Sequence, residues 1–500
     1  MSSQMLWGTL IGLVLTLLLS GTLAATPSPE FSAAAARTVP RASCGPHDQT
    51  ESGLQGQTTL AERFRLGPSK AYNCNLERVG QFEGEGASAG MVAFEDCAYY
   101  SIIRGPKTQH PGVAVVDVSD AAHPNTTTYL DSPAMAGPMG PFESLTVSAG
   151  RKLLAASNMA ARDPTPFDLY DISDCRHPVL KSSAAFPGLY SHSGEFSSDG
   201  QVYYGSKWPL DPKDRSVIFV IDVSHPSSPR LLLRWYPDPS WITHSIVVSS
   251  DGKRAYVSIK RMVNDQTETK NPNGLAILDV SDIQAHRSKP QIRLVSTLFW
   301  EDTHGSEGMQ LVTLQGKRFL TFSDNQGAID YQSPRPGEMC ASGRPSYGFA
   351  RIIDLSDEMT PRTASTLMLE ADAPANCTQV VHDSKEYGAY GSYACIVDNP
   401  ENGRLLACAS WQSGLRVFDI RDPVHPKEVA YYKPSARRSE VRPGSLLALD
   451  PHSDRTTDPV ITFPRFRKGG TEIWLTSVQN GFQVLRFEAP FVAAHRDLFQ

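Results

Sequence analysis

The sequence predicts an all-β protein, a seven-bladed β-propeller with four antiparallel strands in each blade, on the basis of three observations. A phrase built on Asp-x-Ser-Asp and ending in proline occurs six times along the chain. Its copies lie about 50 to 75 residues apart, which is the length of four short strands with their loops. Each copy follows an apolar run rich in β-branched residues, as expected of a buried strand.

The repeated phrase has a mechanical role in this fold. Its Asp and Ser side chains can bond nearby backbone amides, and its Pro fixes the dihedral angle at which the outermost strand begins. In five of the six copies, the proline falls seven residues after the first Asp. We therefore assign a structural role to Asp117, Asp171, Asp222, Asp279, Asp354 and Asp419, and to Pro124, Pro178, Pro229, Pro361 and Pro426.

Residues 192–236 illustrate the four strands of one unit. The segment SHSGEF is followed by an SSDG turn and by QVYYGSKW, which together read as a hairpin. After a variable loop, SVIFVIDV forms an apolar strand that ends in the repeated phrase, and RLLLRWY forms the last strand. No segment after the N-terminal leader shows a sustained helical period.

The ring needs a seventh blade, which the C-terminal region supplies only in part. The segment ITFPRFRKGGTEIWLTSVQNGFQVLRF gives three strands, with Arg486 where an Asp is expected. Residues 75–84 (NLERVGQFEG) read as a displaced outer strand, so we expect them to fill the missing place and close the ring. The propeller is accordingly predicted over 75–490, followed by a C-terminal tail of residues 491–500.

The N-terminus predicts export. Residues 1–25 contain an apolar run ending in small residues, which is typical of a cleaved signal peptide, although no Lys or Arg precedes the run. An uncleaved membrane anchor is the alternative, because about 20 apolar residues span a bilayer. Residues 26–74 form a leader and extension before the ring. We expect a secreted or extracytoplasmic protein, a monomer with no membrane contact beyond the signal segment.

Eight cysteines, an even number in an exported chain, predict disulfides. The sequence contains no Cys-x-x-Cys pair, so a structural zinc site is not expected. Cysteines 395 and 408 flank the NPENG turn almost symmetrically, so they are expected to face each other across a hairpin. The places of the others in the predicted blades suggest the remaining pairs. The expected disulfides are Cys395–Cys408, Cys340–Cys377, Cys97–Cys175 and Cys44–Cys74.

The strand-and-turn pattern, with its apolar-apolar-Asp-Val-Ser-Asp-x-x-x-Pro core, resembles the LVIVD-repeat family of exported β-propeller proteins. The resemblance covers roughly residues 75–488, and LLACASWQSGLRVFDIRDPVHPKEVAYYKP at 405–434 is especially typical. It implies the fold and the compartment. Because the biochemical role of that family is largely undefined, the resemblance implies no reaction. The degenerate seventh unit and a long insertion in the fifth unit depart from the pattern.

Several histidines fall at or just before innermost strands, so they are expected at one mouth of the central channel. They are His192, His244, His304, His382 and His452, with Glu143, Glu195 and Glu307 in similar positions. Imidazoles beside carboxylates can hold a transition metal or transfer protons, and we name His192, His244, His304, His382 and Glu307 as candidate ligands. Alternatively, these histidines hydrogen-bond the backbone of the neighbouring blade. The long loop of residues 324–347 is expected on the same face.

Composition excludes some functions and leaves two. A net charge of −6 with no basic stripe argues against nucleic-acid binding, and no Gly-x-Ser-x-Gly, His-Glu-x-x-His or phosphate-binding glycine loop occurs. The leading prediction is a non-catalytic binding scaffold for a protein or a surface carbohydrate, with no assigned cofactor and no assigned catalytic residue. The alternative is a metal-dependent oxidoreductase or hydrolase at the His-rich mouth.

Overall fold

A computed structural model describes residues 37–64, 70–87, 89–159, 164–209, 214–261, 272–325, 336–383, 390–437, 441–449 and 455–499. The predicted signal peptide lies outside these residues. From Arg37 onward the chain forms one compact unit. Within the described residues, no helix is both long enough and apolar enough to cross a bilayer.

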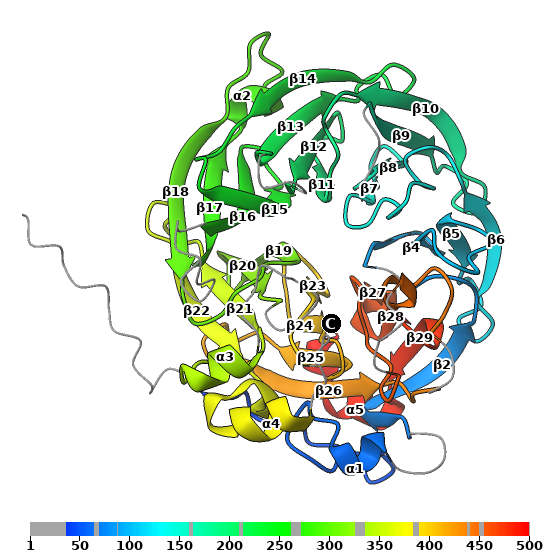
Figure 1. Cartoon of the computed structure of the whole chain (residues 1–500), viewed down its shortest axis with the longest axis vertical. Coiled ribbons are helices and arrows are strands. Elements are labelled where there is room, and N and C mark those ends of the chain that lie inside the picture. Colours follow the sequence, from blue (N-terminus) through cyan, green and yellow to red (C-terminus); the bar gives the residue numbers. More distant parts are fainter. Residues whose placement is uncertain are drawn as a thin grey trace, which may run out of the picture. The chain divides into compact units, whose positions relative to one another are not determined.

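Seven antiparallel sheets stand around a central axis as the blades of a propeller (Figure 1), which confirms the predicted fold class. Blades 1 to 5 each place their strands in chain order from the axis outward, whereas blades 6 and 7 also take a strand from the N-terminal region. Blade 1 contains β3 (Met91–Phe94), β4 (Cys97–Ile102), β5 (Gly112–Asp117) and β6 (Asn125–Leu130). Blade 2 contains β7 (Thr146–Ser148), β8 (Leu153–Ser157), β9 (Thr165–Asp171) and β10 (Val179–Phe186). Blade 3 contains β11 (Ser193–Phe196), β12 (Val202–Lys207), β13 (Val217–Asp222) and β14 (Arg230–Trp235).

The remaining blades continue around the ring. Blade 4 contains β15 (Trp241–Val248), β16 (Arg254–Arg261), β17 (Asn273–Asp279) and β18 (Arg293–Trp300). Blade 5 contains β19 (Met309–Leu314), β20 (Lys317–Ser323), β21 (Ala350–Asp354) and β22 (Arg362–Leu367). Blade 6 contains β23 (Ala394–Val397), β24 (Leu405–Ala409), β25 (Leu415–Asp419) and β26 (Lys427–Lys433), with β1 (Tyr72–Cys74) outside β26. Blade 7 contains β27 (Arg465–Arg467), β28 (Glu472–Ser477), β29 (Gly481–Phe487) and β2 (Leu76–Phe82).

The N-terminal strand closes the ring as predicted. Strand β2 pairs antiparallel with β29, so blade 7 combines three C-terminal strands with one N-terminal strand. Two neighbouring N-terminal segments therefore reinforce two neighbouring blades, because β1 extends blade 6 immediately before β2 completes blade 7. The sequence did not predict the pairing of β1.

The repeated phrase forms the turn between the third and fourth strands of its blade. In all six copies the first Asp accepts a hydrogen bond from the amide two residues later, at 2.9 to 3.1 Å. The pairing between the third and fourth strands also shifts register in every blade, blade 7 included. The turn and the bulge together direct each outer strand, because a bulge increases strand bending and twist.

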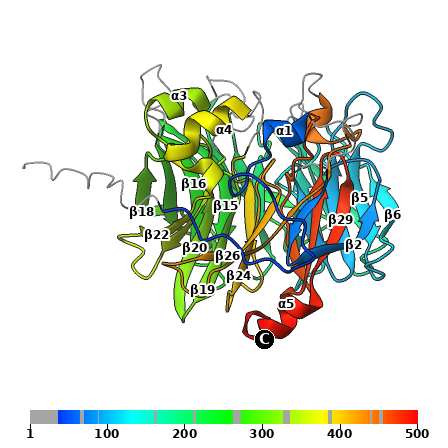
Figure 2. The same cartoon turned by 90° about the horizontal axis from the view of Figure 1, so that it is seen from below.

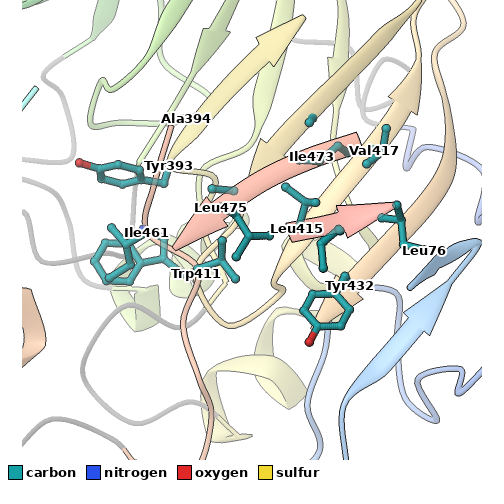
Figure 3. Packing of buried hydrophobic residues seen from close by; sticks show 14 of the residues in the cluster. Leu76, Tyr393, Ala394, Trp411, Leu415, Val417, Tyr432, Ile461, Ile473 and Leu475 are labelled. Atoms are coloured by element: carbon teal, nitrogen blue, oxygen red, sulfur yellow. The ribbon is translucent and has the colours of Figure 1, made fainter. Parts of the chain in front are cut away.

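The hydrophobic core lies between adjacent blades. Figure 3 shows one such layer, where Leu415 and Val417 of blade 6 pack with Ile473 and Leu475 of blade 7, beside Trp411. Each side chain is almost fully buried, and burying a Leu, Ile or Val stabilises the fold by roughly 1.5–3 kcal/mol. Because these residues lie on β25 and β28, the packing joins the middle strands of two adjacent blades.

Short helices decorate the ends of the ring, and their lengths explain why no helical period was found. They are α1 (Leu60–Arg63), α2 (Ser281–Gln284), α3 (Pro336–Ala341), α4 (Cys377–Asp383) and α5 (Ala489–Ala494), with single 3₁₀ turns at Glu370–Asp372, Pro374–Asn376, Leu446–Leu449, Lys468–Gly470 and Arg496–Leu498. In Figure 2, α1, α3 and α4 lie at one end of the ring and α5 lies at the other. Phe491 and Leu498 of the predicted C-terminal tail are buried in the core.

The eight cysteines form the four expected disulfides. Cys395 and Cys408 are register partners on β23 and β24, with their Cα atoms 4.0 Å apart. The other three pairs have Cα separations of 4.9 to 5.8 Å and join Cys44 to Cys74, Cys97 to Cys175, and Cys340 to Cys377. Cys97–Cys175 joins β4 of blade 1 to the repeated turn of blade 2, Cys340–Cys377 joins α3 to α4, and Cys44–Cys74 joins the N-terminal extension to β1.

The N-terminal extension also docks through buried charges. The guanidinium of Arg416 in blade 6 lies 2.8 Å from Oε2 of Glu51 and 3.0 Å from Oε1 of Glu428. The Arg416 side chain is fully buried, and both carboxylates are nearly so. The main chain of Val39 adds a further contact, because its amide donates to the carbonyl of Met368.

Candidate metal centre in the central channel

Two carboxylates and two imidazoles, one from each of blades 2 to 5, meet at one end of the central channel. His192 directly precedes the innermost strand of blade 3, whereas Glu143 and Glu307 lie a few residues before those of blades 2 and 5. His244 lies within β15, where the pairing with β16 is irregular between Thr243 and Ile246. We call Glu143, His192, His244 and Glu307 the channel cluster.

Local backbone contacts hold each member in place. The amide of His192 donates to the carbonyl of Ser206, and the amide of Glu307 donates to that of Ser323, at 2.8 and 3.0 Å. Glu143 forms an isolated parallel bridge with Ser193 of the next blade. The first two contacts continue the strand pairings of blades 3 and 5, and the third links blade 2 to blade 3, so the cluster is built on the regular part of the fold.

The polar atoms of the channel cluster face one another at short range. Oε2 of Glu143 lies 3.7 Å from Nδ1 of His192 and 3.9 Å from Nδ1 of His244. Nε2 of His244 lies 3.7 Å from Oε2 of Glu307. One donor atom each from Glu143, His192 and His244 fall within 4.8 Å of one another. All four side chains are largely or completely shielded from solvent.

Neighbouring polar groups orient the two carboxylates. The hydroxyl of Tyr393 in blade 6 donates to Oε1 of Glu143 at 2.8 Å, so this contact joins blade 6 to blade 2. The side-chain amide of Asn325 donates to Oε1 of Glu307 at 2.5 Å, and the indole of Trp411 donates to Asn325 at 2.9 Å. In both carboxylates, one oxygen is held by the protein while the other faces a histidine.

Aromatic rings surround the imidazoles. The ring centroids of His192 and His244 lie 4.0 Å apart. Trp208 meets His244 edge-on at 4.9 Å, and Phe142 meets His192 edge-on at 5.2 Å. These apolar contacts exclude water and so strengthen every electrostatic interaction inside the cluster.

Burial sets the protonation of the cluster. It lowers the pKa of the His244 imidazole well below its ordinary value, and the neighbouring His192 lowers it further. Burial also raises the pKa of the Tyr393 hydroxyl well above its ordinary value, an effect to which the carboxylates of Glu143 and Glu307 add. His244 is therefore neutral and Tyr393 keeps its proton at physiological pH.

A cavity of about 470 Å³ extends along the channel from this cluster. Its wall runs from Glu143, Ser193 and Ser245 at the cluster to Ser250 and Glu401 in the hairpin turns at the other end of the innermost strands. We call it the axial cavity. All seven blades contribute to its wall, for example through Met91, Thr146, Glu195, Val247, Gln310, Ile396 and Arg465.

Two charged groups of opposite sign line the axial cavity. Burial raises the pKa of Glu195 to about 7, whereas it lowers the pKa of Arg465 to about 10. Oε1 of Glu195 accepts a hydrogen bond from the amide of Phe196, and the guanidinium of Arg465 donates to the carbonyl of Met91. The cavity can therefore offer a hydrogen-bonding carboxyl group and a cation to a polar ligand.

The structure brings together some of the predicted ligands and not others. His192, His244 and Glu307 meet as expected, and Glu143 joins them although it was noted only for its position. His382 is exposed on α4 rather than at an innermost strand, so its predicted placement was wrong, because a helix occupies the link between blades 5 and 6. His304 is buried in the link between blades 4 and 5 and is not one of the grouped donors.

Two further expectations cannot be placed. His452 lies outside the described residues, as does the middle of the predicted long loop, residues 326–335. The described ends of that loop do contribute, because Asn325 orients Glu307 and α3 carries Cys340.

Comparison with known proteins identifies the repeat. Residues 216–236, which span β13, its turn and β14, match the family model described as the LVIVD repeat. Blade 3 contains an LVIVD repeat. This match within a seven-bladed ring confirms the resemblance seen in the sequence. No curated protein matches the chain.

Solved structures with a similar fold span most of this chain. A hydrazine synthase chain of Kuenenia stuttgartiensis is 13% identical with a TM-score of 0.48, and the match covers 82% of this chain and 96% of that one. A protein from Lactobacillus plantarum is 11% identical with a TM-score of 0.46, covering 77% and 98%. The β-propeller domain of Cps50 (Swd1) from Myceliophteria thermophila is 10% identical with a TM-score of 0.45, covering 83% and 100%. We draw no functional conclusion from similarities of this size.

Proposed function

We propose that this LVIVD-repeat propeller is an exported, non-catalytic binding protein whose axial cavity takes the end of a surface carbohydrate. The cavity is the observation that carries the proposal. Its volume of about 470 Å³ lies within the roughly 300–1,000 Å³ typical of ligand sites. Because the wall consists of innermost strands packed between blades, the site is preformed, and preorganisation favours affinity.

The chemistry of the wall favours a hydroxyl-rich ligand. Polar residues including Thr146, Thr313, Glu195 and Arg465 line it. Such groups can each donate to or accept from a sugar hydroxyl. A protein partner would have to insert a narrow segment to use the same cavity, which makes it the weaker of the two predicted partner classes.

Export is supported by the disulfides. Four bridges join all eight cysteines, and disulfides persist in oxidising compartments such as the periplasm or the extracellular space. The predicted signal peptide supports the same compartment. Mass spectrometry of the mature protein, recovered from culture medium or periplasm, would locate its N-terminus.

A glycan array followed by calorimetric titration with the best soluble oligosaccharide tests the proposed ligand. Glu195→Gln keeps the shape of the wall but removes an acid, so we expect saccharide affinity to fall at least about tenfold. The control is Glu301→Gln, because Glu301 is exposed outside the cavity. If no saccharide binds, or if a saccharide binds Glu195→Gln unchanged, the proposal is wrong.

A metal-dependent enzyme is the second candidate, and the channel cluster is the observation that favours it. Two imidazoles with carboxylates are a ligand set used by zinc and iron enzymes. No nucleophile motif accompanies the cluster in the sequence, and for this reason binding remains the first proposal. Elemental analysis of the purified protein tests whether the cluster holds a metal, and only turnover of a substrate by the metal-loaded protein would favour the enzyme over the binding protein.

A further inference from the structure

We propose that Glu143, His192 and His244 bind one divalent first-row transition-metal ion, and that Glu307 orients His244 from the opposite edge of its ring. This metal site lies at the end of the central channel where the channel cluster is found. The proposal does not depend on which ligand the axial cavity binds. The argument rests on the spacing of the donor atoms, on an unsatisfied buried oxygen, and on the groups that hold the donors.

The donor atoms are spaced as ligands of one ion. Metal–nitrogen and metal–oxygen bonds of about 2.0–2.2 Å in tetrahedral geometry place neighbouring ligand atoms roughly 3.3–3.6 Å apart. The observed separations of 3.7 and 3.9 Å between Oε2 of Glu143 and the two Nδ1 atoms are slightly longer than this. They exceed the roughly 2.7–3.2 Å of a hydrogen bond. The two imidazole donors lie within 4.8 Å of each other, so movements of up to about 1 Å would bring the three donors to these ligand distances.

One carboxylate oxygen of Glu143 is buried without a hydrogen-bond partner among the described residues. Its Oε2 is buried and accepts no hydrogen bond within the described part of the chain, although Oε1 accepts one from Tyr393. An unsatisfied buried polar atom is unfavourable by about 1–3 kcal/mol, and more when the group is charged. Since Oε2 faces both imidazoles, a cation bound between the three side chains would satisfy it.

The groups around the donors resemble those that support metal ligands in general. A histidine that binds a metal usually presents its second ring nitrogen to a carboxylate or carbonyl. Nε2 of His244 faces Glu307 in this way, at 3.7 Å. Glu307 is in turn held by Asn325, and Asn325 by Trp411. These contacts hold Glu307 in place beside the ring of His244.

The hydrogen bonds of Ser245 set the tautomer of His244 in the metal-free chain. The hydroxyl of Ser245 donates to the carbonyl of Glu307 at 2.5 Å, so its oxygen accepts from Nδ1 of His244 at 3.0 Å. Binding of a cation at Nδ1 requires the other neutral tautomer, in which the ring proton lies on Nε2 and faces Glu307.

The first experiment measures binding of Zn²⁺ to the full mature chain after chelator treatment, by calorimetric titration and elemental analysis. We expect one ion per chain and a rise in melting temperature. His192→Gln, His244→Gln and Glu143→Gln should each weaken Zn²⁺ binding at least about 100-fold. The matched control is His382→Gln, which should bind Zn²⁺ as the wild type does, because His382 is exposed on α4.

A second measurement does not depend on the folding of the variants. Wild-type protein loaded with one equivalent of Cu²⁺ should show an electron paramagnetic resonance spectrum with hyperfine coupling to imidazole nitrogen.

Tyr393→Phe should weaken Zn²⁺ binding by about 10- to 100-fold, because it removes the hydrogen bond that holds Glu143. Absence of stoichiometric Zn²⁺ from the folded wild type, or a Cu²⁺ spectrum without nitrogen coupling, overturns the proposal.

Discussion

Replacing Gly80 with alanine is expected to weaken the closure of the ring. Gly80 lies in β2, the N-terminal strand that completes blade 7. A Cβ atom at this position would lie 1.9 Å from the carbonyl oxygen of Ala121 and 3.1 Å from Cδ of Pro124. Both residues belong to the repeated turn of blade 1, so the outer strand of blade 7 passes this turn in close contact.

The magnitude follows from what must move. The clash involves backbone, so no side-chain rotation relieves it, and β2 must shift by more than about 1 Å to reach an ordinary contact distance. Overpacking of this kind destabilises proteins by about 1–3 kcal/mol. Alanine also restricts the unfolded chain, which offsets about 0.4–1 kcal/mol of that loss. We expect a net loss of about 1–2 kcal/mol.

Urea denaturation compares Gly80→Ala with Gly150→Ala. A Cβ atom at Gly150 would meet nothing within 4 Å, so this control has the same effect on the unfolded chain without the clash. Hydrogen exchange of the β29 amides should also become faster in Gly80→Ala, because β29 is the partner of β2. Equal stability of the two variants would refute the placement of β2 against blade 1.

Two further predictions concern buried charges. Glu51→Gln should lower the free energy of unfolding by about 3 kcal/mol, because loss of one partner of a buried ion pair is strongly destabilising. The loss is no larger because Glu428 still neutralises Arg416. Denaturation of Arg362→Gln, which breaks an exposed pair, should differ from wild type by less than about 1 kcal/mol. Glu195 has a folded pKa of about 7, above its unfolded value, so its contribution to stability is fully present below pH of about 4.5 and is lost as the pH rises toward 7. Glu195→Gln should therefore gain stability relative to wild type across that window, by at most about 3 kcal/mol, and a constant difference from pH 4 to 8 would contradict this.

The repeats made most of the fold predictable. Each repeated Asp and Pro sets a turn, and the number of turns and the intervening strands determine the number of blades. The displaced strand at 75–84 was recognisable because its composition matched an outer strand in a chain that lacked one. The same reasoning placed Cys395 opposite Cys408, since hairpin register follows from the turn.

Other elements left no such signal. Helices of four to seven residues are too short to show a helical period, so α4 was missed and His382 was misplaced. The pairing of β1 with β26 joins segments more than 350 residues apart, which no local pattern records. The irregular pairing at His244 likewise depends on how β15 meets β16, and it is this irregularity that turns His244 and Ser245 toward Glu143 and Glu307.

The channel cluster and the axial cavity adjoin each other. Glu143 and Ser245 belong to the cavity wall and also contact His244. Three protein donors leave at least one coordination position of a transition metal open. A ligand that fills the cavity as far as Glu143 would therefore lie beside that position. Saccharide binding measured with and without Zn²⁺ then separates the alternatives: affinity that rises with the ion indicates a shared site, and unchanged affinity indicates that the ion serves the fold.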